Sequence, residues 1–124
     1  MNAFKEMGLV EKGTITVRYL QQYLKKKKGQ LDSYDAKTMY VKLTEEMGEL
    51  ARHIIRGEKH AQDAEHLKDS IEEELYDILY YTLMLANREN VDLETWIPLK
   101  EAMNNKRYPS GIEFDPNDES VYDD

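Results

Sequence analysis

The chain has 124 residues, which suits one small domain, and 40% of them are hydrophobic. It has no cysteine, which excludes disulfides and thiolate metal sites and makes the cytoplasm the expected compartment. The sequence shows no apolar run that could span a membrane and no N-terminal secretory signal, so we expect neither a transmembrane helix nor secretion.

The negative charge is concentrated in a tail. The formal net charge is −8, but residues 108–124 hold six of the 25 acidic residues and no Lys or Arg. The rest of the chain has 19 acidic and 17 basic residues. Without a broad basic face, we expect no nonspecific binding to nucleic acid. The basic run from Lys25 to Lys28 is interpreted as a helix end, where cations interact favourably with the helix dipole.

The chain divides into an N-terminal extension (residues 1–13), a helical domain (14–107) and the acidic tail (108–124). Helical periodicity predicts a first helix over about residues 14–28. A second helix is expected to follow a cap at Ser33 or Asp35 and to reach Arg56, where Gly57 supplies a left-handed stop.

A third helix is predicted from Glu65 or Ser70 to Asn87, after a polar stretch. Asp92 is a candidate cap for a final helical region that ends near Arg107. Pro98 favours a short turn over residues 93–96 and a helix over 98–107, and the tail is expected to be extended or disordered on its own. No strand pattern competes, so the predicted fold is all-α, with four to five helices.

Two segments of the predicted helices resemble each other. Residues 43–50 read LTEEMGEL and residues 71–78 read IEEELYDI, with an offset of 28. On a helical wheel centred on Leu43, Met47, Leu50 and Ile54 form an apolar stripe, and Ile71, Leu75, Ile78 and Thr82 repeat it. Beside each stripe lies one pair of carboxylates, about 60° and about 120° from its centre. The two pairs are Glu46 with Glu49, and Glu74 with Asp77.

If the two helices pack on those stripes, up to four carboxylates meet at their seam. Such a cluster repels itself strongly unless a cation neutralises it. Oxygen ligands without Cys or His favour a hard ion, so we expect Mg²⁺, with Mn²⁺ as a substitute. The alternative for each pair alone is an ordinary solvated helix face, because Glu is a good helix former.

A third group of residues is suited to binding phosphate. Lys100, Asn104 and Arg107 fall within about 40° on one helical face. Lys and Arg bind phosphate oxygens, and Asn can donate to them. The alternative is a solvated helix end.

The segments KLTEEMGEL, EEELYDILYYTLMLA and VDLETWIPLKEAMNNKRYP together resemble the MazG-like nucleotide pyrophosphohydrolases of the all-α NTP pyrophosphatase superfamily. The resemblance covers residues 37–109, and the ending KxxxNxxRYP is similar to the dCTP pyrophosphatase-like branch. It implies an all-α bundle completed by dimerisation, as a homodimer or a dimer of dimers. It also implies Mg²⁺-dependent hydrolysis of a (d)NTP to the (d)NMP and pyrophosphate.

The metal ligands of that family map onto Glu46, Glu49, Glu74 and Asp77, and its phosphate-binding residues onto Lys100, Asn104 and Arg107. In the mechanism that we hypothesise, Glu46 or Glu49 is the general base that takes a proton from the attacking water.

His53 and Tyr81 are candidates for a further substrate contact, although we favour a solvated histidine at position 53. For Tyr80 and Trp96 we favour the core or a subunit interface. The third predicted helix is apolar over more than one face, which a short chain can bury most readily by dimerising.

Three other functions remain open from the sequence. Phosphoribosyl-ATP pyrophosphohydrolase belongs to the same superfamily and would be separated by a substrate panel. A non-catalytic acidic helical interaction module would show no stabilisation by Mg²⁺. A di-iron bundle is disfavoured because the ExxH ligand pairs are missing.

Overall fold

The structure, a computed structural model, describes residues 15–27, 34–57 and 60–123. Every regular element in these ranges is helical, which confirms the all-α prediction. None of the described helices is both long enough and apolar enough to cross a membrane. The helices are α2 (Val17–Lys26), α3 (Ala36–Arg56), η2 (Ala64–His66), α4 (Ile71–Arg88), α5 (Leu93–Arg107) and η3 (Glu119–Tyr122).

The two longest helices start and end at positions that the sequence offered: α3 starts after Asp35 and ends at Gly57, and α4 starts after Ser70. The side chain of Asp35 accepts a hydrogen bond from the backbone N–H of Thr38 and so starts α3. Gly57 ends α3 in the left-handed conformation at φ 68°, which glycine adopts without strain. The Ser70 hydroxyl accepts from the backbone N–H of Glu73 and starts α4. The other cap candidate, residue 33, lies outside the described residues.

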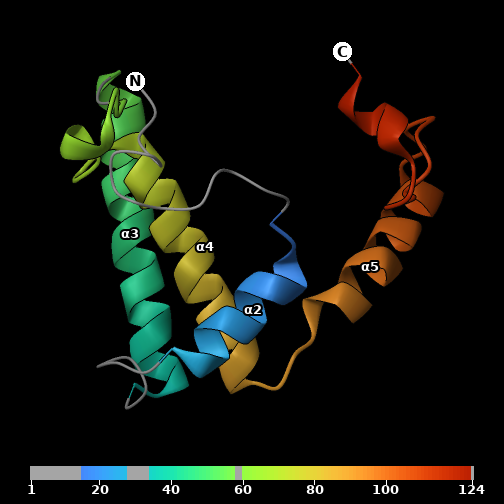
Figure 1. The fold of residues 1–124 in the computed structure, drawn as a ribbon, viewed down its shortest axis with the longest axis horizontal. Helices are drawn as coiled ribbons and strands as arrows, with labels where there is room; N and C mark the ends of the chain where they lie inside the picture. The colour runs from blue at the N-terminus through green and yellow to red at the C-terminus, as the bar shows by residue number, and fades with distance from the viewer. Residues whose placement is uncertain (1–14, 28–33, 58–59, 124) are drawn as a thin grey trace. The chain divides into compact units, whose positions relative to one another are not determined.

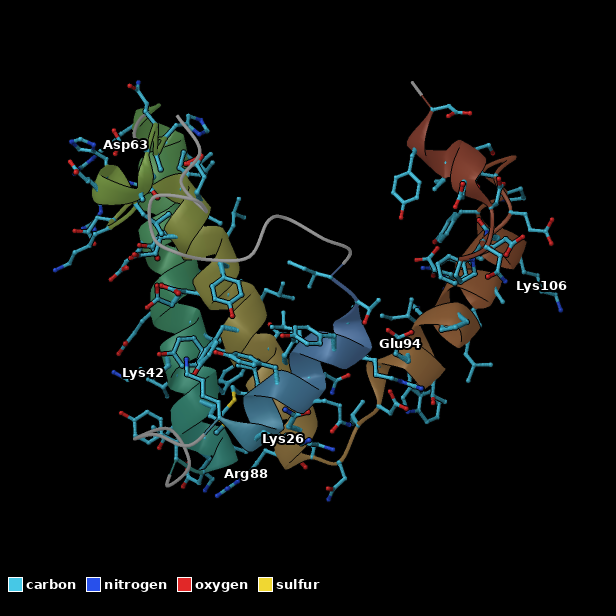
Figure 2. The ribbon with its side chains drawn as sticks, viewed as in Figure 1. Lys26, Lys42, Asp63, Arg88, Glu94 and Lys106 are labelled. Carbon is cyan, nitrogen blue, oxygen red and sulfur yellow. The ribbon has the colours of Figure 1, made fainter. Side chains whose placement is uncertain are left out.

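Helices α3 and α4 lie side by side and run in opposite directions (Figure 1). Figure 2 shows Lys42 of α3 near the same end of this hairpin as Arg88 of α4, with Asp63 at the other end. Helix α2 crosses the C-terminal half of α4, where Gln21 Nε2 donates to Asn87 Oδ1 at 3.0 Å. Asn87 Nδ2 returns a 3.0 Å bond to the carbonyl of Gln21, so the two helices are joined by a reciprocal pair of amide bonds.

These three helices form one compact unit that ends at Val91, and residues from Asp92 onward form a second. Within the second unit, α5 is one continuous helix with Pro98 inside it, so the predicted break before Pro98 is wrong. A proline in the second turn removes one backbone hydrogen bond and crowds the carbonyl four residues earlier, which can kink a helix without ending it. Beyond it, the tail ends in η3, whose first turn is capped by the Asp118 carboxylate accepting from the N–H of Ser120.

Several side chains of the predicted apolar stripe are exposed in the single chain. Met47 is 54% exposed, Ile54 60% and Leu75 53%. Of the stripe residues, Ile71 is buried. Among the described residues, the buried apolar side chains come from α2, α3 and α4, and they are Leu24, Met39, Ile71, Leu83 and Met84. A helical wheel fixes the angles between residues of one helix, but not which angle faces the neighbouring helix. The prediction was wrong about which side of each helix faces its neighbour.

Candidate metal centre

The face of α3 that packs against α4 is marked by residues seven apart. Met39 and His53 are buried and Glu46, midway between them, is half-buried. Residues i and i+7 lie about 20° apart on a helix, so these three form one line along the seam. The carboxylate of Glu46 therefore lies in the middle of the seam and not at its margin, which corrects the prediction.

Helix α4 brings a second carboxylate into the same seam. The side chain of Glu74 is only 1% exposed, although glutamate is rarely buried without a partner. One carboxylate oxygen from each of Glu46, Glu49 and Glu74 lies within 4.8 Å of the other two. Glu74 Oε2 is buried and has no hydrogen-bond partner among the described residues. Three of the four predicted ligands therefore converge, and we call them the carboxylate trio.

The electrostatics of the trio are those of like charges held in a poorly solvated place. Burial, together with contact with Glu46 and Glu49, raises the pKa of Glu74 from 4.5 to about 8. The fourth predicted ligand, Asp77, lies beside the trio. Its pKa is raised to about 6 by burial and then by the charges of Glu46, Glu73 and Glu49. Both shifts have the same direction, so negative charge is disfavoured at this place.

This arrangement fits a divalent cation. The trio supplies only oxygen donors, the ligands that hard ions prefer. A cation would also give the orphaned oxygen of Glu74 a partner and would neutralise the repulsion that raises its pKa. The described residues therefore contain an oxygen-rich centre at which a metal ion could polarise a phosphoanhydride.

A second acidic group adjoins the trio, and the sequence pattern did not reveal it. Asp69, Glu73 and Glu74 also place one carboxylate oxygen each within 4.8 Å of the others. Glu73 accepts a 3.3 Å bond from the N–H of Asp69. The sequence pattern that could have revealed this group is the capping box Ser70-x-x-Glu73. A capping box turns the side chain of Glu73 back toward the residues that precede the helix.

The two further substrate-contact candidates lie in or beside the seam. His53 is 6% exposed, and its Nδ1 is buried with no hydrogen-bond partner among the described residues. The interpretation of His53 as a solvated residue is therefore wrong, because the seam follows the line through Met39 and Glu46. Tyr81 is half-buried, and its pKa is raised by burial and then by the charges of Glu46 and Asp77. Tyr81 therefore borders the carboxylates.

The predicted phosphate-binding residues lie on α5, in the second unit. Lys100 and Arg107 are exposed and Asn104 is half-buried. The guanidinium of Arg107 lies 5.4 Å from the ring centroid of Tyr108, within the range of a cation–π contact. The three side chains share one helical face, as the i, i+4, i+7 spacing predicts.

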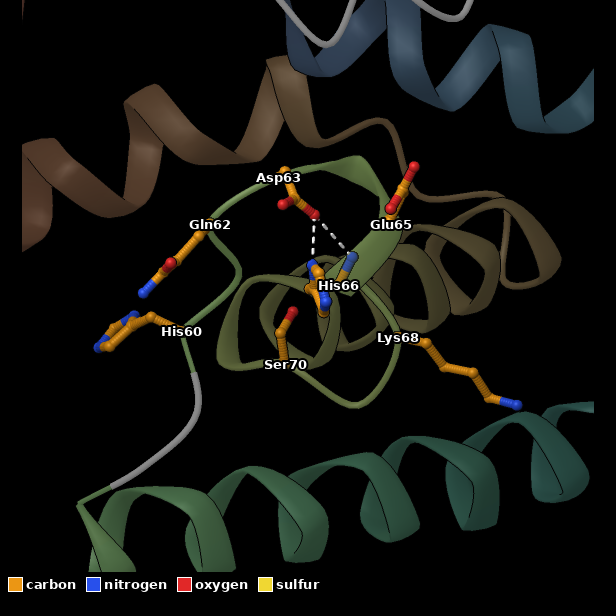
Figure 3. Close-up of a pocket in the computed structure, with 7 residues that line it drawn as sticks. All are labelled: His60, Gln62, Asp63, Glu65, His66, Lys68 and Ser70. Atoms are coloured by element: carbon orange, nitrogen blue, oxygen red, sulfur yellow. Dashed lines mark hydrogen bonds and ion pairs between the residues drawn. The ribbon is translucent and has the colours of Figure 1, made fainter. Parts of the chain in front are cut away.

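A pocket in the connection between α3 and α4 is separate from the predicted site residues (Figure 3). His66 Nδ1 lies 2.6 Å from Asp63 Oδ1, and the backbone N–H of His66 donates to the same oxygen at 3.0 Å. At the pocket's edge, His60 Nδ1 lies 3.0 Å from Glu72 Oε2. These pairs shape the connection, and none of the predicted site residues lines the pocket.

Comparisons with known proteins identify similar chains. The chain is similar to iMazG from Vibrio DAT 722. The Ntag form is 35% identical with a TM-score of 0.64, and the match covers 77% of this chain and 100% of that one. The Ctag form is 36% identical with a TM-score of 0.63, covering 73% and 99%. YpjD of Bacillus subtilis (strain 168) is 45% identical over 58 residues, 45% of this chain and 51% of that protein, so the match spans about half of YpjD.

A family model described as the MazG nucleotide pyrophosphohydrolase domain matches residues 35–109. These residues make up more than half of the chain and include α3, α4 and α5, with all of the predicted ligands. The chain therefore belongs to the MazG nucleotide pyrophosphohydrolase family, whose members hydrolyse phosphoanhydride bonds.

Proposed function

We propose that this protein is a Mg²⁺-dependent nucleoside triphosphate pyrophosphohydrolase that converts a (d)NTP and water to the (d)NMP and pyrophosphate. The observation that carries the proposal is the carboxylate trio, with its buried and unpartnered Glu74 oxygen. Oxygen ligands alone favour Mg²⁺, and Mn²⁺ is the expected substitute.

Glu46, Glu49, Glu74 and Asp77 are the proposed ligands. A divalent ion bound there supplies Lewis-acid catalysis, since it polarises phosphoryl oxygens and makes a water molecule more acidic. Glu46 or Glu49 is the proposed general base, which accepts the proton from the attacking water. The seam also limits access of bulk water, which strengthens electrostatic interactions within it.

The cationic face of α5 carries the proposed phosphate-binding residues. Lys100, Asn104 and Arg107 are proposed to bind the phosphate oxygens and to stabilise the charge that develops on the leaving pyrophosphate. His53, one turn after Glu49 on α3, and Tyr81, on which the charges of Glu46 and Asp77 act, are the proposed further contacts to the substrate.

The exposed apolar side chains of the hairpin support a homo-oligomer, which we propose to be a homodimer or a dimer of dimers. Met47, Ile54 and Leu75 are each more than half exposed in the single chain. Covering such side chains stabilises an assembly by about 25 cal/mol for each Å² of apolar surface removed from water. A second copy of the chain is the simplest partner that offers the same apolar face. We place this assembly in the cytoplasm, as the absence of cysteine suggests.

The test is pyrophosphate release from a panel of canonical and damaged nucleoside triphosphates and phosphoribosyl-ATP, with Mg²⁺. Glu49→Ala and Asp77→Ala should each lower kcat/KM by about a hundredfold or more, because losing a metal ligand removes several kcal/mol of transition-state stabilisation. Their helix content by circular dichroism should match the wild type. Glu45→Ala is the matched control, since Glu45 lies on the same helix but is exposed and pairs with Lys42 at 3.6 Å. Retained turnover in both site variants would contradict the ligand assignment, and turnover of phosphoribosyl-ATP alone would replace the proposed substrate.

A further inference from the structure

A face of aromatic side chains spans the contact between α2 and α4. On α2, the rings of Tyr19 and Tyr23 stack with centroids 6.2 Å apart. On α4, Tyr80 forms edge contacts with Tyr76 at 6.1 Å and with Tyr81 at 5.4 Å. We call these five rings, together with Lys27 at the end of α2, the tyrosine face.

Lys27 joins the two helices of this face. Its ammonium nitrogen lies 5.9 Å from the ring centroid of Tyr23 and 5.6 Å from that of Tyr80. Both distances are within the range at which a cation is attracted to an aromatic ring. Lys27 therefore positions a ring of α2 and a ring of α4 around one point.

The tyrosine face starts at the carboxylates. Tyr80 and Tyr81 follow Asp77 by three and four residues on α4, so the three side chains lie on neighbouring parts of one helix surface. Their Cβ atoms are then about 5–6 Å apart. The charges of Glu46 and Asp77 also act on the Tyr81 hydroxyl, which agrees with this placement.

Much of the face is open to solvent. Tyr19 is 60% exposed and Tyr23 46%, so these rings are not filling a core. The faces of aromatic rings are good platforms for nucleobases, each stack contributing about 1–3 kcal/mol, because every base has a flat π surface. A nucleotide whose polyphosphate lies at the carboxylates must direct its base onto an adjoining surface, and the tyrosine face adjoins them.

We infer that the tyrosine face binds the nucleobase and sugar of the substrate, with Tyr23 and Tyr80 as the stacking rings and Lys27 as the residue that positions them. The inference rests on the proposed function, since it takes the carboxylate trio as the place where the polyphosphate binds.

The test compares the kinetics of Tyr23→Leu and Tyr23→Phe with those of the wild type. Tyr23→Leu should raise KM for a nucleoside triphosphate about tenfold, equal to about 1.4 kcal/mol of lost stacking, while kcat changes less than about twofold. Tyr23→Phe keeps the ring and should restore the wild-type KM. Inorganic triphosphate, used as a competitive inhibitor, has no base, so its inhibition constant should be the same in all three proteins. Tyr40→Leu, which removes a 63% exposed tyrosine from α3, is the control and should leave KM unchanged.

An unchanged KM in Tyr23→Leu, with a wild type that turns over nucleotides, overturns the tyrosine face alone. The same holds if KM and the inhibition constant of triphosphate rise together, since that pattern reports damage at the carboxylates. A loss of the wild-type oligomer by sedimentation in place of a KM effect assigns Tyr23 to a subunit contact and also overturns the inference. A wild type that hydrolyses no nucleotide overturns the proposed function, and this inference with it.

Discussion

Replacing Glu74 by Gln should stabilise the protein in the absence of metal ions, and increasingly so as the pH rises. The buried carboxyl has a pKa of about 8 against 4.5 in a model compound, so the folded state holds a proton that the unfolded state releases between these values. Stability must therefore fall as the pH rises through this window. The penalty of Glu74 relative to a neutral side chain is about 1 kcal/mol at pH 5, about 3 kcal/mol at pH 7 and about 5 kcal/mol at pH 9. Glutamine has nearly the same shape and its amide can donate to Glu46, as the protonated carboxyl does.

The assay is urea unfolding with a chelator at pH 5, 7 and 9, for the wild type, Glu74→Gln and the control Glu45→Gln. Glu45 is exposed on the neighbouring helix α3, and its ion pair with Lys42 is of the kind that contributes little to stability. The difference in unfolding free energy between Glu74→Gln and the wild type should grow by about 4 kcal/mol from pH 5 to pH 9. A difference that is constant with pH, or that shrinks toward pH 9, would refute the assignment of Glu74 as a buried carboxyl with a raised pKa.

Two further measurements test the site and the helix that carries it. Mg²⁺ should raise the melting temperature more at pH 8 than at pH 6, because Glu74 and Asp77 must lose protons to bind it. Calorimetry in buffers of different ionisation enthalpy should detect this proton release at pH 7. Mg²⁺ binding that is independent of pH would contradict the coupling. Gly57→Ala should lower the free energy of unfolding in urea by about 1 kcal/mol, because Gly57 has a positive φ. Gly48→Ala is the control, since Gly48 lies in the middle of α3 with open space where a methyl group would be added. It should be neutral or stabilising in the same assay.

The local features of this fold could be predicted from the sequence because each depends on a few neighbouring residues. Asp35, Ser70 and Gly57 cap or end their helices as their side chains and backbone freedom require. The convergence of Glu46 with Glu74 could be predicted as well, because two carboxylate pairs at matching helical positions have a common explanation only if they meet.

The rotation of each helix about its axis could not be predicted. The wheel placed Met47 on the buried stripe, whereas the seam runs along Met39, Glu46 and His53. For an isolated hairpin, the best assumption is that the largest aliphatic side chains are buried. The assumption fails when carboxylates of a functional site occupy the contact between the helices and a second copy of the chain can cover the apolar side chains. The break predicted before Pro98 was wrong for a different reason, since a proline in the second turn strains a helix but does not have to end it.

The position of the carboxylates couples folding to metal binding. Placing the trio in the seam that holds α3 against α4 opposes folding, because three like-charged groups share a poorly solvated space and one of them keeps a proton near neutral pH. A cation that binds the folded state and not the unfolded chain removes this cost, so its binding free energy appears as stability. If the seam were neutral, the hairpin would be more stable without metal but would lose the negative charge that attracts the ion. The same residues therefore limit the stability of the metal-free protein and supply the affinity that the proposed hydrolysis requires.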